Sequence, residues 1–176
     1  DMLTQVAEAK GIGSLCGLDE GATDLDLSRR NLQVIDAKLL AWELTTGYVS
    51  ASLTSIDLSW NDLRKDGAVA VANALHVNAS MTKLQVNNCE LPIDILKNGT
   101  EVDLSNKGLS VEDAIIIAGC INVNASLTEL NLAANALCGI GLGGNGTYDA
   151  TGIQAIATAL NVNASMKTMN VLFNSI

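Results

Sequence analysis

Residues 53–63 read LTSIDLSWNDL, and the same pattern of alternating apolar and polar residues returns five more times along the chain. Alternation with a period of two is typical of a β-strand with one buried face. The other copies are 22–32 (ATDLDLSRRNL), 81–91 (MTKLQVNNCEL), 99–109 (GTEVDLSNKGL), 127–137 (LTELNLAANAL) and 166–176 (MKTMNVLFNSI). We therefore predict six strands, near 24–28, 55–59, 83–87, 101–105, 129–133 and 168–172.

The segments that follow several of these copies change to a helical period. Ala68, Val71, Ala72 and Leu75 stand at i, i+3, i+4 and i+7, which places them on one apolar stripe. Helices are predicted at 66–75, 112–121 and 151–160. Each is followed by the string HVNAS or NVNAS, whose third residue is Asn78, Asn124 or Asn163. Because asparagine tolerates the left-handed conformation, we expect these residues to end the helices there.

Aligned, the six copies read L-x-x-L-x-L-x-x-N/C-x-L, and this consensus resembles the leucine-rich repeat family. The copies lie 31, 28, 18, 28 and 39 residues apart, and the recurring 28 resembles the ribonuclease-inhibitor-like branch. The resemblance covers residues 22–176. It implies an α/β solenoid with a curved parallel sheet on the concave side and helices on the convex side. It also implies that Asn61, Cys89, Asn135 and Asn174 bind the turn backbone, a role that Arg30 and Lys107 do not fit.

Four regions depart from the regular pattern. The third copy is followed by PIDILKNG (92–99), which leaves room for one helical turn at most, although the sheet is expected to continue. The fifth carries a glycine-rich insertion at 138–149, predicted to be a flexible loop. Residues 1–21 are predicted to form an N-terminal cap, and an extra TTGYV (45–49) belongs to the first unit. At the other end, we expect further repeats or a neighbouring subunit to cover the edge near residue 176.

Composition excludes several classes of function. The 176 residues carry a net charge of −9 and are 48% hydrophobic but only 3% aromatic, so the core is aliphatic and nucleic acid is an improbable ligand. Four scattered cysteines and one histidine give little support for a metal site, and the cysteines are predicted to be free buried thiols. We expect no catalytic residue, no cofactor and no membrane insertion. The compartment is unknown, with an intracellular location slightly favoured.

Five Asn-x-Ser/Thr sequences could accept glycans. Those at 78, 124 and 163 belong to the repeat, so turn chemistry explains them without glycans. Asn98 and Asn145 also match, and Asn145 would be the best acceptor if the protein is secreted.

The favoured function is a non-catalytic scaffold that binds another protein through the concave face and its bordering loops. Trp60 is a candidate interface anchor, although it could instead cover the edge of a repeat. Asp26, Asp57 and Asp103 share one motif position and are read as solvated surface acids, not as an acid–base pair. The predicted partner-binding residues are Asp26, Arg29, Asp57, Trp60, Lys83, Gln85, Asp103, Glu129 and Asn131. The alternatives are a structural subunit or fragment docked in a larger assembly, or a GTPase-activating regulator of the leucine-rich Ran type.

Overall fold

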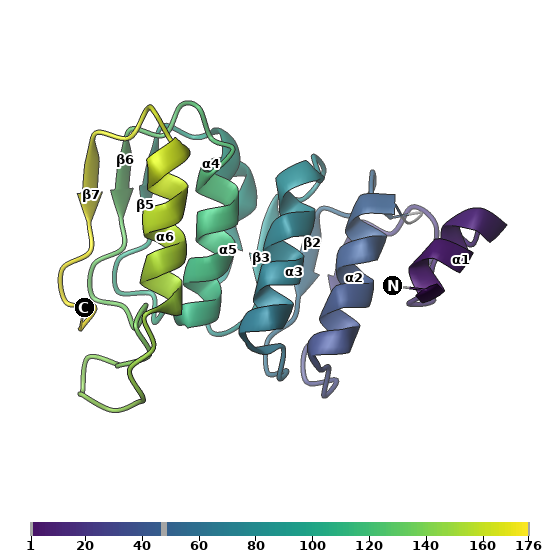
Figure 1. Cartoon of the computed structure of the whole chain (residues 1–176), viewed down its shortest axis with the longest axis horizontal. Coiled ribbons are helices and arrows are strands. Elements are labelled where there is room, and N and C mark those ends of the chain that lie inside the picture. Colours follow the sequence, from purple (N-terminus) through teal and green to yellow (C-terminus); the bar gives the residue numbers. More distant parts are fainter. Residues whose placement is uncertain (1, 47–48, 176) are drawn as a thin grey trace.

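A computed structural model describes residues 2–46 and 49–175, in which strands and helices alternate along the chain (Figure 1). The helices are α1 (Met2–Lys10), α2 (Val34–Thr46), α3 (Arg64–Val77), α4 (Ile93–Asn98), α5 (Val111–Ile121) and α6 (Thr151–Val162). The strands are β1 (Asp24–Asp26), β2 (Ser55–Asp57), β3 (Lys83–Gln85), β4 (Glu90–Pro92), β5 (Glu101–Asp103), β6 (Glu129–Asn131) and β7 (Thr168–Asn170). Each of the six expected strand positions holds a strand of only three residues. Part of the extra segment at 45–49 lies outside the described residues.

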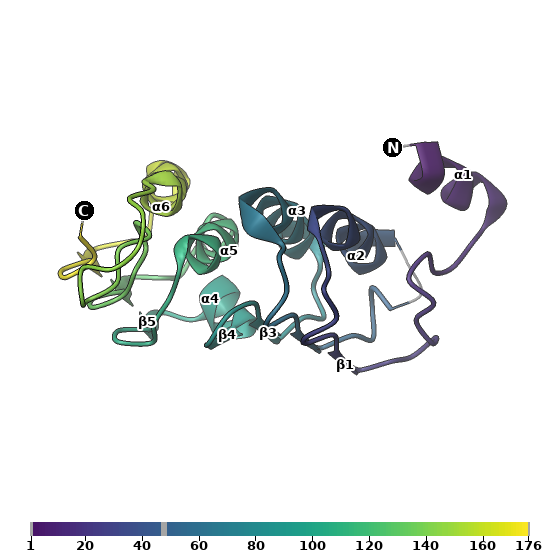
Figure 2. The same ribbon diagram turned by 90° about the horizontal axis from the view of Figure 1, so that it is seen from below.

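The elements form two layers. Figure 2 shows α2, α3, α5 and α6 side by side in one row, with the strands lying along the other side. We call these four helices the helix row. Neighbours in the row contact one another in the order α2, α3, α5, α6. Because the parallel strands β1, β2, β5 and β6 all lead toward their helices at the same end, the loops that follow them gather along one border, the strand-to-helix edge (the lower border in Figure 1).

The strands form two sheets, and the expectation of one continuous parallel sheet is therefore wrong. In the first sheet β1, β2 and β3 are parallel, and β4 adds to β3 in the antiparallel direction. In the second sheet β5, β6 and β7 are parallel. The cause is the short third unit. After β3 the chain turns back on itself, and β4 occupies the edge with which β5 would otherwise pair.

The short helix α4 lies outside the helix row, beside the strands (Figure 2). Its six residues exceed the single turn expected from the sequence. The ammonium group of Lys97 donates to the carbonyl of Leu75 at 2.7 Å and also to that of Asn78. These carbonyls lie at the C-terminal end of α3, where a positive charge is favoured by the helix dipole. Lys97 thus ties α4 to the C-terminal end of α3, and α4 lies beneath α5, which takes the next place in the row (Figure 2).

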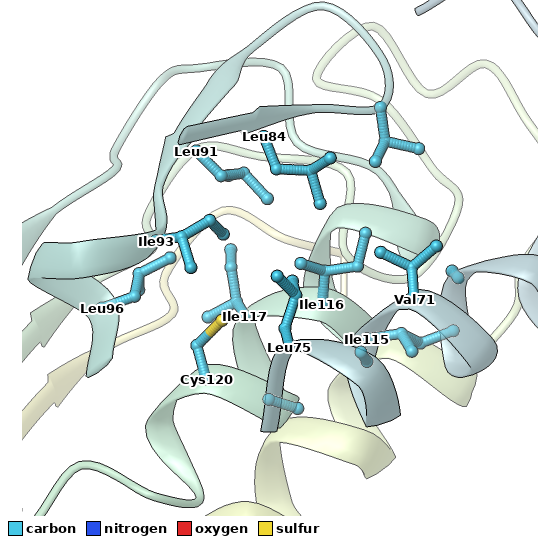
Figure 3. Close-up of a cluster of buried hydrophobic side chains, with 14 of the residues drawn as sticks. Val71, Leu75, Leu84, Leu91, Ile93, Leu96, Ile115, Ile116, Ile117 and Cys120 are labelled. Carbon is cyan, nitrogen blue, oxygen red and sulfur yellow. The ribbon is translucent and has the colours of Figure 1, made fainter. Parts of the chain in front are cut away.

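The hydrophobic core continues across the break between the sheets. Figure 3 shows Leu84, Leu91, Ile93 and Leu96 from the third unit facing Leu75, Ile116, Ile117 and Cys120 from α3 and α5. Leu84, Leu91, Ile93, Leu96, Ile116 and Ile117 are fully buried in one core cluster. Aliphatic side chains have no directional requirement, so they can pack across a place where strand pairing stops.

Where the ninth motif position is an asparagine, its side chain binds the backbone of the turn in the preceding unit. The side-chain amide of Asn61 donates to the carbonyl of Leu27 at 2.8 Å, and its oxygen accepts from the N–H groups of Arg30 and Leu32 at 3.1 and 2.9 Å. Asn135 binds the turn at Lys107 and Leu109 in the same way. The turns at Arg30 and Lys107 therefore need no asparagine of their own. Cys89 does not take this role, since its thiol donates only to the adjacent carbonyl of Glu90.

A second set of asparagines fixes the opposite border, where the helices return to the strands. The expected left-handed conformation is wrong, because φ is −71° at Asn78 and −77° at Asn163. The side chains act instead. The Asn124 amide donates to the carbonyls of Leu96 and Gly99 at 3.0 and 2.9 Å, and its oxygen accepts from the backbone N–H groups of Ser126 and Leu127. Asn78 and Asn163 make the equivalent bonds. Their amides donate to carbonyls of the preceding unit, and their oxygens accept from the N–H groups two and three residues ahead.

The cysteines do not all match the expectation of buried thiols. All four are free, and Cys120 and Cys138 are buried. Cys16 is exposed and Cys89 is partly exposed, so the prediction is wrong for these two. Cys16 lies in the N-terminal segment and Cys89 in the turn before β4, both of which border the core without entering it.

The buried carboxyl group of Asp113 links the turn after β3 in the first sheet to the start of α5, the helix that follows β5 of the second sheet. Asp113 in α5 occupies the position at which the matching helices have Gly67 and Gly152. One oxygen accepts from the N–H of Ser110 at 2.9 Å and from the Asn87 amide at 3.2 Å. The other is buried, and no described residue provides it with a hydrogen-bond partner. Burial is the main cause that raises the pKa of Asp113 above its ordinary value of 3.8.

Removal of one buried asparagine side chain tests the hydrogen-bonded ladder. Asn124→Ala should lower the free energy of unfolding by about 2–4 kcal/mol, because it leaves two carbonyls and two N–H groups of the turn without partners. Urea denaturation measures the loss. The matched control is Asn145→Ala in the exposed glycine-rich loop, which should stay within about 0.5 kcal/mol of the wild type. Equal effects of the two substitutions would contradict the role given to Asn124.

The pH dependence of stability tests Asp113. A carboxyl whose pKa is raised in the folded state binds its proton more tightly there than in the unfolded chain, so its contribution to stability falls as the pH rises above 3.8 through the folded pKa. Asp113→Asn keeps an acceptor for Ser110 and Asn87 but has no charge to desolvate. Urea unfolding from pH 4 to pH 7 should show the variant gaining stability relative to wild type. Exposed Asp94, changed to Asn, is the control, and parallel curves for wild type and Asp113→Asn would contradict this account.

Candidate functional site

The fifth motif position carries polar side chains that fix the turn after each strand. The side-chain oxygens of Asp26, Asp57 and Asp103 accept the N–H two residues ahead, at 2.9, 2.8 and 2.8 Å. Asn131 and Asn170 make the same bond at 3.1 Å. Hydrogen bonds from Ser28 and Ser105 lower the pKa of Asp26 and Asp103 respectively. These two carboxylates are therefore ionised at neutral pH, which suits electrostatic recognition better than proton transfer.

The eighth position carries side chains that project outward from the strand-to-helix edge. Its backbone is left-handed in five units, where φ is 56° at Arg29, 60° at Trp60, 54° at Asn106, 58° at Ala134 and 60° at Phe173. Trp60 and Phe173 are 66% and 74% exposed. The guanidinium carbon of Arg29 lies 5.4 Å from the centroid of the Trp60 ring, within the range of a cation–π contact.

The break between the sheets divides the predicted binding residues into two groups. The register of the first sheet places Asp26, Asp57 and Gln85 next to one another, with Arg29 and Trp60 at the following turns. Lys83 lies at the start of β3, and its ammonium forms an ion pair with Glu90 of β4 at 3.2 Å. The second sheet carries Asp103, Glu129 and Asn131. The nine residues thus do not form the single uninterrupted face that a continuous sheet would produce, because β4 and α4 lie between the groups.

The second sheet has an open hollow of about 480 Å³ along the strand face that is turned away from the helix row. Glu101, Asp103 and Glu129 line it, and none of the lining residues is basic. Its other lining residues are Val102, Leu130, Asn131, Thr168 and Asn170. The register sets Glu101 beside Glu129, so two carboxylates of the same charge lie on neighbouring strands. The surface is negative, and it complements positive charge on a ligand.

Three polar residues of this hollow were missed by the sequence analysis: Glu101, Thr168 and Asn170. The motif register could have identified them. Glu101 and Thr168 stand at the third position, which is also the position of the predicted residues Lys83 and Glu129. Asn170 stands at the fifth position, like Asp57 and Asn131.

The described residues show no arrangement suited to catalysis by a thiol or by a metal. Burial raises the pKa of Cys120 to about 12 and is the largest cause that raises the pKa of Cys16 to about 11, so neither forms a thiolate readily. Within residues 2–46 and 49–175, no three His, Cys, Asp or Glu side chains lie close enough to hold a metal ion. In the same part of the chain, the helices are all too short or too polar to cross a bilayer.

The family model described as Leucine Rich repeat matches residues 49–72, which contain β2, the turn at Trp60 and Asn61, and the first part of α3. The search of curated proteins finds no match. The matched segment contains the strand, asparagine turn and helix that define the geometry above, and it supports the assignment of the chain as a leucine-rich repeat protein.

Proposed function

We propose that this protein is a non-catalytic scaffold that binds another protein through its strand faces and the loops that border them. Leucine-rich repeats are generally protein-interaction modules, which supports this general role. The observation that carries the proposal is the acidic hollow on the second sheet. Its carboxylates are in register on adjacent strands, they face away from the core, and the hollow is open to a partner.

The proposal includes the arrangement of the repeats. We infer that the six units stack as one right-handed solenoid of the ribonuclease-inhibitor-like branch, interrupted at the third unit. The helix row supports stacking, and several hydrogen bonds join residues 28 apart, such as Thr82 to Thr54 and Thr128 to Thr100. Such stacking presents equivalent side chains at equivalent heights, which suits recognition of an extended surface.

We also propose that the N-terminal segment, residues 1–21, acts as the cap of the first unit. The Glu43 carboxylate accepts hydrogen bonds from the Ser14 hydroxyl and from the N–H groups of Leu15 and Cys16, at 2.7, 2.6 and 2.8 Å. The Trp42 indole donates to Glu8 at 3.0 Å. These contacts support a cap, since they tie α1 and the following segment to α2.

At the opposite end, we propose that further repeats or a neighbouring protein surface cover β7. No described strand pairs with the outer edge of β7. Leu172 and Phe173 are 65% and 74% exposed beside it. An open strand edge next to exposed apolar side chains is suited to contact with another surface.

The double variant Glu101→Gln, Glu129→Gln tests the binding role of the acidic hollow. It removes two negative charges at nearly constant size and leaves the turn-forming Asp103 in place. A partner captured by affinity purification and then purified should bind the variant about tenfold more weakly in calorimetric titration, because complementary charge across the interface is lost. The dependence of the affinity on salt should also decrease.

The matched control is Glu20→Gln, Asp94→Asn, which removes two exposed charges that do not line the acidic hollow. It should bind like the wild type. Equal binding by both double variants would exclude the acidic hollow as the contact surface, and failure to capture any partner protein would count against the scaffold role itself.

A further inference from the structure

The exposed aromatic residues lie on one border of the molecule. The chain has two Trp, two Tyr and one Phe. Trp42 is buried in α2, and Tyr48 lies outside the described residues. The other three, Trp60, Tyr148 and Phe173, are 66%, 59% and 74% exposed, and all follow a strand on the strand-to-helix edge. Aromatic and arginine side chains are enriched at the centres of protein interfaces. This edge therefore has the composition of a contact surface.

Arg29, Arg30 and Lys107 on the same edge form no ion pair with any described residue, whereas Arg64 and Lys65 do. Arg64 pairs with Asp62 at 2.9 Å, and Lys65 pairs with Asp149 at 2.7 Å. Arg29 contacts the face of Trp60 instead. The ring has no acceptor atom for the guanidinium N–H groups, and no described residue accepts from those of Arg29, so they remain available to a carboxylate, which can accept two parallel hydrogen bonds.

The turn at these residues is held rigidly by the backbone. The N–H of Arg29 donates to the carbonyl of Ser59 at 3.0 Å, and the Asn61 oxygen accepts from Arg30 and Leu32. Holding the turn in place lowers the entropy lost when a ligand is bound. The turn itself does not call for a large side chain, because the left-handed conformation favours asparagine, as at Asn106, and disfavours bulky residues. The geometry of the turn thus explains neither the ring of Trp60 nor the guanidinium of Arg29.

We propose that the Arg29–Trp60 pair binds a side-chain carboxylate in an acidic segment of the partner protein, an inference that rests on the proposed scaffold function. The guanidinium of Arg29 supplies the two donors, Trp60 packs against the aliphatic part of the bound Glu or Asp, and Arg30 adds positive charge beside them. The charge of Arg30 contributes to the lowered pKa of Asp26, whose carboxylate also accepts from the N–H of Ser28. A protein segment is favoured over nucleic acid because the net charge of −9 repels a long polyanion.

Nuclear magnetic resonance of the uniformly ¹⁵N-labelled chain tests the proposal with two synthetic probes, hexaglutamate and hexaglutamine. Each tryptophan gives one indole N–H signal, and Trp60→Phe assigns them. Hexaglutamate at low salt should shift the Trp60 signal saturably. The Trp42 signal should not move, since that indole is buried and bound to Glu8. Hexaglutamine should shift neither signal. Absence of a saturable shift of Trp60 with hexaglutamate would overturn the proposal.

Two arginine variants locate the binding group. Arg29→Gln should weaken hexaglutamate binding about tenfold, as expected for the loss of a charge-assisted bidentate contact. Arg64→Gln is the matched control, because Arg64 is exposed on the same edge but bound to Asp62, and it should bind like the wild type. Equal weakening by the two variants would overturn the assignment to Arg29. That result would leave the scaffold function standing, because the acidic hollow is tested separately with the captured partner and the Glu101, Glu129 variant.

Discussion

The structure depends on hydrogen bonds from buried and half-buried asparagine side chains to the backbone of the preceding unit. Every strand in this chain is only three residues long, so short ladders leave many turn carbonyls and N–H groups without strand partners. Asn61 and Asn135 satisfy these groups at one border, and Asn78, Asn124 and Asn163 satisfy them at the other. Because each amide binds backbone carbonyls of the unit before its own, these carbonyls have their hydrogen-bond partners only when the next unit is folded beside them. The same burial explains why the glycan acceptor sequences at Asn78 and Asn124 are inaccessible in the folded chain.

The third unit shows which part of the architecture tolerates a deletion. Its ninth position is Cys89, which cannot bridge two turns, and its chain is too short to return as a full helix. Strand pairing stops there, yet the helix row and the apolar core continue. Directional interactions require a partner at a fixed place, whereas aliphatic packing requires only volume and shape. Asn87, Ser110 and Asp113 replace the missing bridge with a small polar network, at the cost of one buried carboxylate oxygen without a described partner.

The repeated pattern predicted the strand positions and the apolar stripes of the helices, because burial imposes a period on the sequence. Ala68, Val71, Ala72 and Leu75 are all buried as expected. The pattern could not predict β4, since the alternation of buried and exposed residues around Leu91 has the same period of two whether the strand runs parallel or antiparallel. The conformation of Asn78 was misjudged because an asparagine after a helix has two possible roles, as a left-handed residue or as a buried amide. Sequence position alone does not distinguish them, and only the carbonyls of Leu44 and Ser50 show which applies.

The sequence indicates which motif positions supply the side chains of the candidate site, but not how those side chains are distributed over the surface. Motif positions three, five and eight hold exposed or partly exposed side chains, whereas the division of that surface depends on a deletion elsewhere in the chain. Its consequence is a difference in charge between the two surfaces. The second sheet presents Glu101, Asp103 and Glu129 without a basic neighbour in the hollow, while the first sheet combines Asp26 and Asp57 with Arg29 and Arg30, which form no ion pair with a described residue. Opposite charges held apart on a rigid frame disfavour a uniformly charged ligand, because attraction at one surface is accompanied by repulsion at the other. A partner that engages both surfaces must therefore carry its own charges in a matching order, which is a stricter requirement than either surface imposes alone.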